Sequence, residues 1–160
     1  MAGVFTVECQ GCDFKQSIIG HNDYAYRLEK PPDVYLWKQY AWCSNCQEVV
    51  PAERLRPSAE SEEYLNHNPS PKLRQNEERY QQMIASRESP ARCLNCGGTE
   101  IIPATGDWPE YCVTHPDCGA DIILRQARPA PSSTGTAVYS SEGRFLLTVE
   151  GILIPGRGYY

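Results

Sequence analysis

The sequence Cys43-Ser44-Asn45-Cys46 is a turn in which two residues separate two cysteines, and this spacing occurs three times in the chain. Residues 9–12 and 93–96 repeat it, and Cys112 and Cys118 complete a total of eight cysteines. Two intervening residues let a tight turn direct both sulfurs at one tetrahedral ion, about 2.3 Å from zinc. Two such turns saturate the ion, so the sequence predicts two closed, structural zinc sites. Iron takes the same four-cysteine ligand set, so the residues leave the metal's identity open.

A thiol oxidoreductase is an alternative interpretation of the Cys43 to Cys46 turn, which is similar to the active-site turn of thioredoxin-type proteins. A redox turn of that kind opens a helix after its second cysteine, because the helix N-terminus lowers the thiolate pKa. Val49, Val50 and Pro51 predict a strand there instead. The metal interpretation is therefore favoured over the redox one.

The composition leaves room for only a small hydrophobic core. Of the 160 residues, 41% are hydrophobic, and 13 prolines and 12 glycines interrupt regular structure. Such a chain needs a further source of stability, and structural zinc contributes about 10–16 kcal/mol per site in isolated zinc-finger peptides. We therefore expect a small, metal-stabilised α+β protein that binds two structural Zn²⁺ ions.

Charge and hydropathy disfavour several classes of partner. The formal net charge of −5 opposes binding to a phosphate backbone, which gains affinity from Lys and Arg. The first residues, MAGVFTVECQGC, lack the basic start and apolar stretch of a secretory signal, so we expect a cytoplasmic protein with reduced thiols. No segment approaches the roughly 18 uninterrupted apolar residues of a membrane span, so no membrane association is expected.

Changes in composition along the chain predict two zinc ribbons joined by a helical connector, with a C-terminal β-hairpin. The first half is rich in aromatic residues spaced by two, a pattern typical of strands. The expected segments are a first zinc ribbon with an aromatic β insertion (1–57), the connector (58–90), a second zinc ribbon (91–126), a linker (127–137) and the hairpin (138–160).

Two of these segments contain recognisable start and turn signals. Ser70 followed by Pro71 is typical of a helix start and predicts a helix over residues 71–87, preceded by a shorter helix after Ser58. The linker is rich in Pro, Ser, Thr and Gly, and the hairpin after it is expected to have a bulge at Gly151.

The pairing of the cysteine turns is the least constrained feature. Closing an 80-residue loop costs only about 0.9 kcal/mol more than closing a 30-residue loop, so entropy alone does not choose a partner for residues 9–12. Sequential pairing is favoured because the composition changes at Pro57. A cross-braced pairing of residues 9–12 with residues 93–96 remains an alternative.

Two segments of the sequence, residues 43–52 and 93–104, are similar to each other. Cys43-Ser44-Asn45-Cys46 leads into Val49-Val50-Pro51-Ala52, and Cys93-Leu94-Asn95-Cys96 leads into Ile101-Ile102-Pro103-Ala104. Both turns run into two β-branched residues and a Pro-Ala exit. The similarity indicates either a duplication or the common physical demands of metal-binding turns.

Residues 93–118 resemble the short C-terminal four-cysteine zinc fingers of bacterial type I DNA topoisomerases. The resemblance rests on Cys93-Leu94-Asn95-Cys96-Gly97-Gly98 and on a second pair, Cys112 and Cys118, with Pro116 two residues before the last cysteine. It implies a zinc ribbon with Cys93, Cys96, Cys112 and Cys118 as ligands. The residues themselves also allow His115, separated from Cys118 by two residues, in place of Cys112. Fingers of that family bind single-stranded DNA, but this segment has four acidic residues and no Lys or Arg between Cys93 and Cys118. The predicted metal ligands are thus Cys9, Cys12, Cys43 and Cys46 at the first site and these four at the second.

No nucleophile and base, carboxylate pair or phosphate-binding glycine loop is recognisable, so we expect no enzyme activity. The leading hypothesis is a non-catalytic protein-interaction module, such as an adaptor, a regulator or a neutralising partner of a basic protein. Nucleic-acid binding through the ribbons is the first alternative, and the CxxC oxidoreductase is the second. The aromatic stretch is expected chiefly to form the core over the first metal site, and a part-exposed aromatic face would suit a protein partner. The candidate binding residues are Tyr35, Trp37, Tyr40, Trp42 and Trp108.

Overall fold

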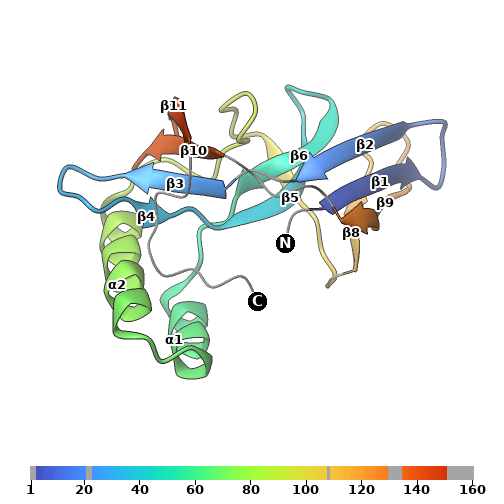
Figure 1. Ribbon diagram of the computed structural model, residues 1–160. Coiled ribbons are helices and arrows are strands. Elements are labelled where there is room, and N and C mark those ends of the chain that lie inside the picture. The colour runs from blue at the N-terminus through green and yellow to red at the C-terminus, as the bar shows by residue number, and fades with distance from the viewer. Residues whose placement is uncertain (1–2, 21–22, 108, 130–134, 151–160) are drawn as a thin grey trace.

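The computed structural model describes residues 3–20, 23–107, 109–129 and 135–150. These residues form two helices and eleven strands in three sheets (Figure 1), which agrees with the expected α+β class. The elements are β1 (Gly3–Cys9), β2 (Lys15–Gly20), β3 (Asp23–Arg27), β4 (Val34–Tyr35), β5 (Lys38–Cys43), β6 (Glu48–Glu53), α1 (Ser58–His67), α2 (Pro71–Ser86), β7 (Ile101–Pro103), β8 (Glu110–Thr114), β9 (Asp121–Pro129), β10 (Gly135–Ser140) and β11 (Phe145–Glu150).

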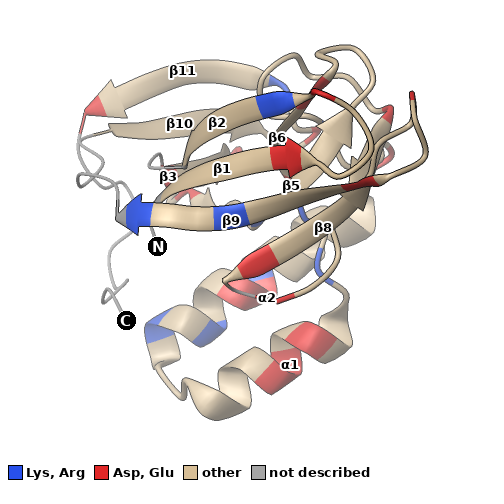
Figure 2. Ribbon diagram, turned by 90° about the vertical axis from the view of Figure 1, so that its right-hand side faces the viewer, with Lys and Arg blue, Asp and Glu red and all other residues tan. Residues whose placement is uncertain are grey.

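The first sheet has the order β2-β1-β9-β8 and joins distant parts of the chain. It consists of two antiparallel hairpins, β1–β2 and β8–β9, held together by antiparallel pairing of β1 with β9 (Figure 2). Val7 pairs with Leu124, and both side chains are fully buried. The expected division into a ribbon of residues 1–57 and a ribbon of residues 91–126 therefore needs correction, because strands from both segments share one sheet and one core.

The second sheet has the order β6-β5-β7, and its strands include parts of both similar segments, residues 43–52 and 93–104. Strands β5 and β6 form a hairpin around residues 43–46, and β7, which follows residues 93–96, pairs with β5 so that Cys43 lies opposite Ile101. Trp42 of β5 packs with Phe5, Val7 and Leu124 in the core shared with the first sheet. The two similar turns are thus neighbours in space.

The third sheet has the order β11-β10-β3-β4 and carries the helices. Strand β10 runs parallel to β3, and α2 packs against β4 with Tyr80 and Met83 buried beside Tyr26 and Leu36 (Figure 1). The helix predicted over residues 71–87 is confirmed as α2, with Pro71 at its first turn. The shorter helix expected after Ser58 is α1.

The C-terminal hairpin is also present, as β10 and β11. The predicted linker of residues 127–137 is shorter than expected. Strand β9 extends to Pro129 and β10 starts at Gly135, so strands occupy both ends of that segment. The bulge expected at Gly151 lies outside the described residues; an irregularity occurs instead between Val138 and Tyr139. Neither α1 nor α2 has the length and apolarity that crossing a membrane requires.

A buried ion pair connects the second and third sheets. The carboxylate of Glu53, at the end of β6, binds the Arg87 guanidinium through two contacts of 2.9 and 2.6 Å, and both side chains are almost completely buried. The Tyr26 hydroxyl and the Arg92 N–H also donate to this carboxylate, at 2.7 and 2.8 Å. Because Arg92 precedes Cys93, this network holds the second cysteine turn against β6.

Candidate metal centres

The first cluster, which we call the inner cluster, consists of Cys43, Cys46, Cys93 and Cys96. One turn, residues 43–46, connects β5 and β6, and the other, residues 93–96, precedes β7. Because β5 pairs with both β6 and β7, the two turns lie together. The Sγ atoms of Cys43 and Cys96 lie 3.6 Å apart, and those of Cys46 and Cys93 lie 3.8 Å apart. Cys43 and Cys93 are fully buried.

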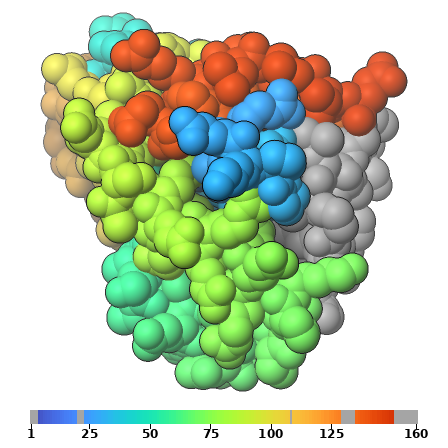
Figure 3. Space-filling view, turned by 90° about the vertical axis from the view of Figure 1, so that its left-hand side faces the viewer, coloured from blue at the N-terminus to red at the C-terminus, as the bar shows by residue number. Residues whose placement is uncertain are grey.

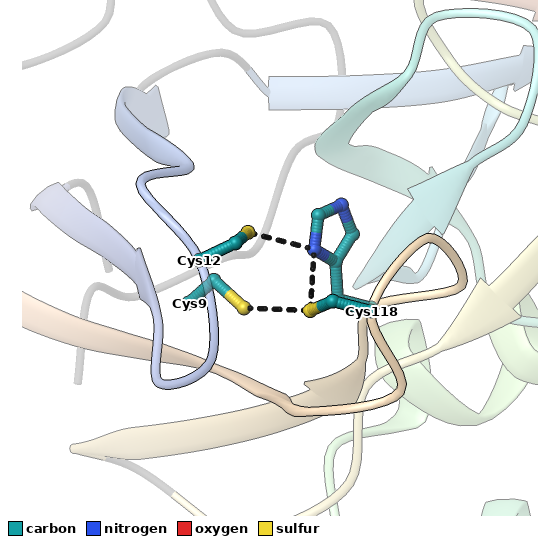
Figure 4. A group of neighbouring side chains, drawn as sticks. Cys9, Cys12 and Cys118 are labelled. Carbon is teal, nitrogen blue, oxygen red and sulfur yellow. Dashed lines mark hydrogen bonds between the residues drawn. The ribbon is translucent and has the colours of Figure 1, made fainter.

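The second cluster, the outer cluster, consists of Cys9, Cys12, His115 and Cys118. Residues 9–12 form the turn after β1, and residues 115–118 form the turn between β8 and β9, so the pairing of β1 with β9 positions all four side chains (Figure 4). The Sγ atoms of Cys9 and Cys118 are 3.4 Å apart, and the His115 Nδ1 atom lies 3.4 and 3.3 Å from the sulfurs of Cys12 and Cys118.

This arrangement corrects the predicted pairing of the turns. Sequential pairing joined residues 9–12 with 43–46, and the cross-braced alternative joined residues 9–12 with 93–96. The structure has neither, because the inner cluster pairs the two middle turns and the outer cluster pairs the first and last ones. The physical reason is the pairing of β1 with β9, a contact between strands that are distant in the sequence.

The structure places His115, the alternative to Cys112, in the outer cluster. Cys112, predicted as a ligand by the topoisomerase resemblance, lies within β8 opposite Ile123 and is not a member of either cluster. Burial, with a contribution from the nearby Asp121 carboxylate, raises the pKa of this thiol and favours its protonated form. His115 and Cys118 have the usual two-residue separation, and their turn begins where β8 ends at Thr114.

Backbone N–H groups donate hydrogen bonds to cysteine sulfurs in both clusters. The Gly11 N–H donates to Cys9 Sγ, the Asn95 and Cys96 N–H groups donate to Cys93 Sγ, and the Gly98 N–H donates to Cys96 Sγ, each at 3.4 Å. Such contacts stabilise thiolates, the form that binds metal.

The pKa values within each cluster diverge. Burial acts to raise the pKa of Cys96, but the Gly98 N–H and the neighbouring thiols outweigh it and lower this pKa to about 7. Burial raises the pKa of Cys93 to about 11 and raises that of Cys46 further. In the outer cluster, hydrogen bonds from the Gly11 N–H and from Cys118 overcome the effect of burial and lower the pKa of Cys9 to about 6. Binding of a cation in either cluster would neutralise the repulsion that opposes ionisation of the remaining thiols.

The distances fit a tetrahedral metal ion. At the usual zinc bond lengths, two ligand sulfurs lie about 3.8 Å apart, and a sulfur and an imidazole nitrogen lie about 3.6 Å apart. The separations of 3.3 to 3.8 Å in the two clusters match this geometry. They are far longer than the roughly 2.05 Å of a disulfide bond, and all eight cysteines are free. Both residue sets can hold a metal ion, and their thiolate-rich composition suits zinc or iron.

Two aromatic rings and one carboxylate lie beside His115 of the outer cluster. The sequence alone did not identify these neighbours. The His115 ring lies 4.8 Å from the Trp42 ring and 5.2 Å from the Phe14 ring, measured between centroids. Its Nε2 atom lies 3.6 Å from an Asp117 carboxylate oxygen, while Nδ1 faces the sulfurs. A carboxylate on the far side of a metal-binding histidine helps to fix the ring's orientation and tautomer.

The candidate aromatic binding residues lie mostly in the core. Trp42 is 4% exposed. Trp37 is half-buried, with the Arg56 guanidinium 3.9 Å from its ring centroid and with Tyr35 in edge contact on another side. Tyr40 packs between Phe5 and Tyr111, and Trp108 lies outside the described residues. The expectation that these aromatic residues form a core is confirmed for Trp42, and a binding role remains a prediction.

No protein-family model, curated protein or solved structure matches this chain. The resemblance of residues 93–118 to topoisomerase zinc fingers therefore has no support from these comparisons. The structure supports two clusters of four potential ligands each, which are compatible with zinc-ribbon-like sites.

Proposed function

We propose that the protein is a non-catalytic protein-interaction module whose fold is stabilised by two structural zinc ions. The supporting observation is that each cluster supplies four ligand atoms from two short turns. A tetrahedral zinc ion with four protein ligands has no open position for a substrate or an activated water. When bound, the ions supply folding free energy and neutralise the thiolates.

The interaction role is supported by exposed apolar side chains on β11. Phe145, Leu146 and Leu147 are 58%, 46% and 38% exposed, and they follow one another in the sequence. Successive side chains of a strand point to opposite faces, so β11 is apolar and exposed on both of its faces, and exposed apolar residues are typical of surfaces that contact another protein. We therefore assign the interaction surface to β11.

A basic partner has less support than the acidic composition suggested. Glu110 binds Arg125 at 2.6 Å, and Asp117 lies beside His115. Figure 2 shows both acidic and basic positions on the strands of the first sheet. The proposal therefore emphasises apolar contacts over charge neutralisation.

Elemental analysis and thiol titration of the purified chain test the metal part of the proposal. We expect two zinc ions per chain, eight reduced thiols, and loss of cooperative unfolding after removal of metal by a chelator. A chain that keeps its fold without metal, or whose cysteines are joined in disulfides, would contradict the proposal.

Nucleic-acid binding is the second candidate function, and one observation favours it. A cavity of about 510 Å³ lies between the first and second sheets, with Phe5, Tyr40 and Tyr111 among its lining residues. Lys38 and Arg54 also line it, and aromatic rings beside cationic side chains suit a stacked base and its phosphate. Asp107 on the same cavity and the Arg54–Glu60 ion pair weaken this interpretation.

Titration with short single-stranded oligonucleotides at several salt concentrations tests the second candidate. Binding should weaken with salt and should decrease in Lys38→Gln, whereas Lys72→Gln on α2, which does not line the cavity, should behave like the wild type. Absence of binding at low salt would exclude this function.

A further inference from the structure

Strand β11 is an apolar edge strand. It pairs with β10 on one side and is the last strand of its sheet among the described residues. Figure 3 shows the hairpin of residues 135–150 along the top of one face of the molecule, where it is open to view. Phe145, Leu146 and Leu147 are more than a third exposed, and β11 contains no proline and a single charged residue, Glu150. Edge strands usually carry charges, prolines or covering segments that prevent pairing with another chain.

Three other edges of the described sheets, β6, β4 and β8, have such protection. The Gln16 side chain covers β6 by donating to the Val49 carbonyl at 2.9 Å and accepting from the Val49 N–H at 3.0 Å. The Asn76 side chain accepts from the Tyr35 N–H of β4, and Thr105 exchanges two backbone hydrogen bonds with Cys112 of β8. For β11, the part of the chain that the structure describes provides no comparable cover on its outer side.

We propose that β11 pairs antiparallel with β11 of a second copy of this chain. This inference rests on the proposed function, since it names the partner of the interaction surface assigned there. Pairing would join two four-stranded sheets into one continuous sheet about a two-fold axis. Because each hairpin has one free outer strand, association stops at two copies.

The charges at the two ends of β11 favour this partner and this orientation. Arg144 precedes the strand and Glu150 ends it, and both side chains are exposed. In an antiparallel pair, Arg144 lies near the partner's Glu150 and Glu150 lies near the partner's Arg144. A parallel pair would instead place like charges together. Opposite charges across neighbouring strands stabilise pairing, and like charges oppose it.

Sedimentation velocity of the metal-loaded chain over a range of concentrations tests the inference. We expect a monomer–dimer equilibrium for the wild type. Leu147→Lys should be monomeric, because it places two ammonium groups in the pairing region. Ile19→Lys changes a more exposed apolar residue on β2, the edge of another sheet, and should leave the equilibrium unchanged.

Charge reversal identifies the orientation. Arg144→Glu and Glu150→Arg should each weaken dimerisation by roughly tenfold, and the double variant should restore it, because the opposite charges face each other again. A wild type that stays monomeric at every concentration, a dimer insensitive to Leu147→Lys, or a double variant weaker than both single variants would overturn the inference.

The metal content of the same samples separates the two proposals. A monomer with two zinc ions overturns self-pairing alone and leaves the structural zinc sites intact. A chain without bound metal contradicts the proposed function itself. Binding of a different protein by a monomeric chain would overturn self-pairing and support the wider interaction role.

Discussion

The inner and outer clusters use similar turns in different surroundings. In the inner cluster, Cys43 and Cys93 are fully buried and both turns belong to one sheet. The inner cluster has one exposed ligand, Cys96, whereas the outer cluster has two, Cys12 and Cys118, and a histidine replaces one cysteine. The facing ligands Cys46 and Cys93 are 47 positions apart, whereas Cys12 and His115 are 103 positions apart.

The comparison separates two roles for a metal ion. The difference in loop length changes the entropy of closure by only about 0.7 kcal/mol, so entropy does not distinguish the clusters. The difference in burial is one of degree: Cys43 and Cys93 are completely buried, so removal of either leaves charged sulfurs in the core, whereas two of the four outer ligands are accessible to water. We infer that the inner ion supports a core and the outer ion joins the first and last strands of one sheet.

Loss of the inner ion should have the largest effect. In Cys93→Ser, we expect loss of one metal ion and of the cooperative fold, since structural zinc contributes about 10–16 kcal/mol in isolated peptides. Cys118→Ser, which alters an exposed outer ligand, should lose one ion but keep a cooperative transition. Elemental analysis and thermal unfolding followed by circular dichroism measure both quantities. Equal loss of structure in the two variants would remove the distinction between the clusters.

The identity of the fourth outer ligand comes next. His115→Ala should lose one ion per chain, because it removes the imidazole nitrogen that faces Cys12 and Cys118. Cys112→Ser should retain both ions, since Cys112 belongs to neither cluster. In the cobalt-substituted wild type, absorption should indicate one site with four sulfurs and one with three. If Cys112→Ser lost one ion and His115→Ala kept both, Cys112 would be the ligand, as the topoisomerase resemblance implies.

The ion pair beside the inner turn should have an intermediate effect. Glu53→Gln removes the charge that neutralises Arg87, and breaking a buried pair costs about 3–5 kcal/mol. Glu48→Gln, at the exposed start of the same strand, is the matched control. Urea denaturation measures the free energy of unfolding in each variant. If both variants unfold at the same urea concentration, the network does not support the inner turn.

The carboxylate beside His115 should have the smallest effect. Asp117→Asn should weaken metal binding at the outer cluster by about tenfold, because it weakens the electrostatic support of the histidine ring. Asp13→Asn, which removes an exposed carboxylate next to Cys12, controls for the change in net charge. Competition with a chromophoric chelator measures the affinity. Equal affinities in the two variants would assign Asp117 no role in orienting the ring.

Local patterns predicted local structure well. The spacing of two residues between cysteines identified six of the eight cluster members, and the alternatives for the last pair contained Cys118 and His115. Ser70 and Pro71 located the start of α2, and aromatic residues spaced by two placed Tyr40 and Trp42 on one strand.

Contacts between distant segments were not predictable in the same way. The pairing of Val7 with Leu124 depends on the burial of two strands in a common core, and no local pattern specifies it. A change in composition at Pro57 suggested a domain boundary, but β6 ends at Glu53 and its sheet receives β7 from residues 101–103. The apolar character of residues 145–147 was visible in the sequence, whereas their exposure required the sheet order.

The nested order of the two clusters sets a sequence of events during synthesis on the ribosome. Residues 43–46 and 93–96 leave the exit tunnel before His115 and Cys118 leave it, so a nascent chain can capture its inner ion first. Once that ion is bound, the loop that the outer turns must close is roughly halved in effective length. Until then, Cys9 and Cys12 remain free thiols, so the outer cluster is the last of the two to gain protection from oxidants.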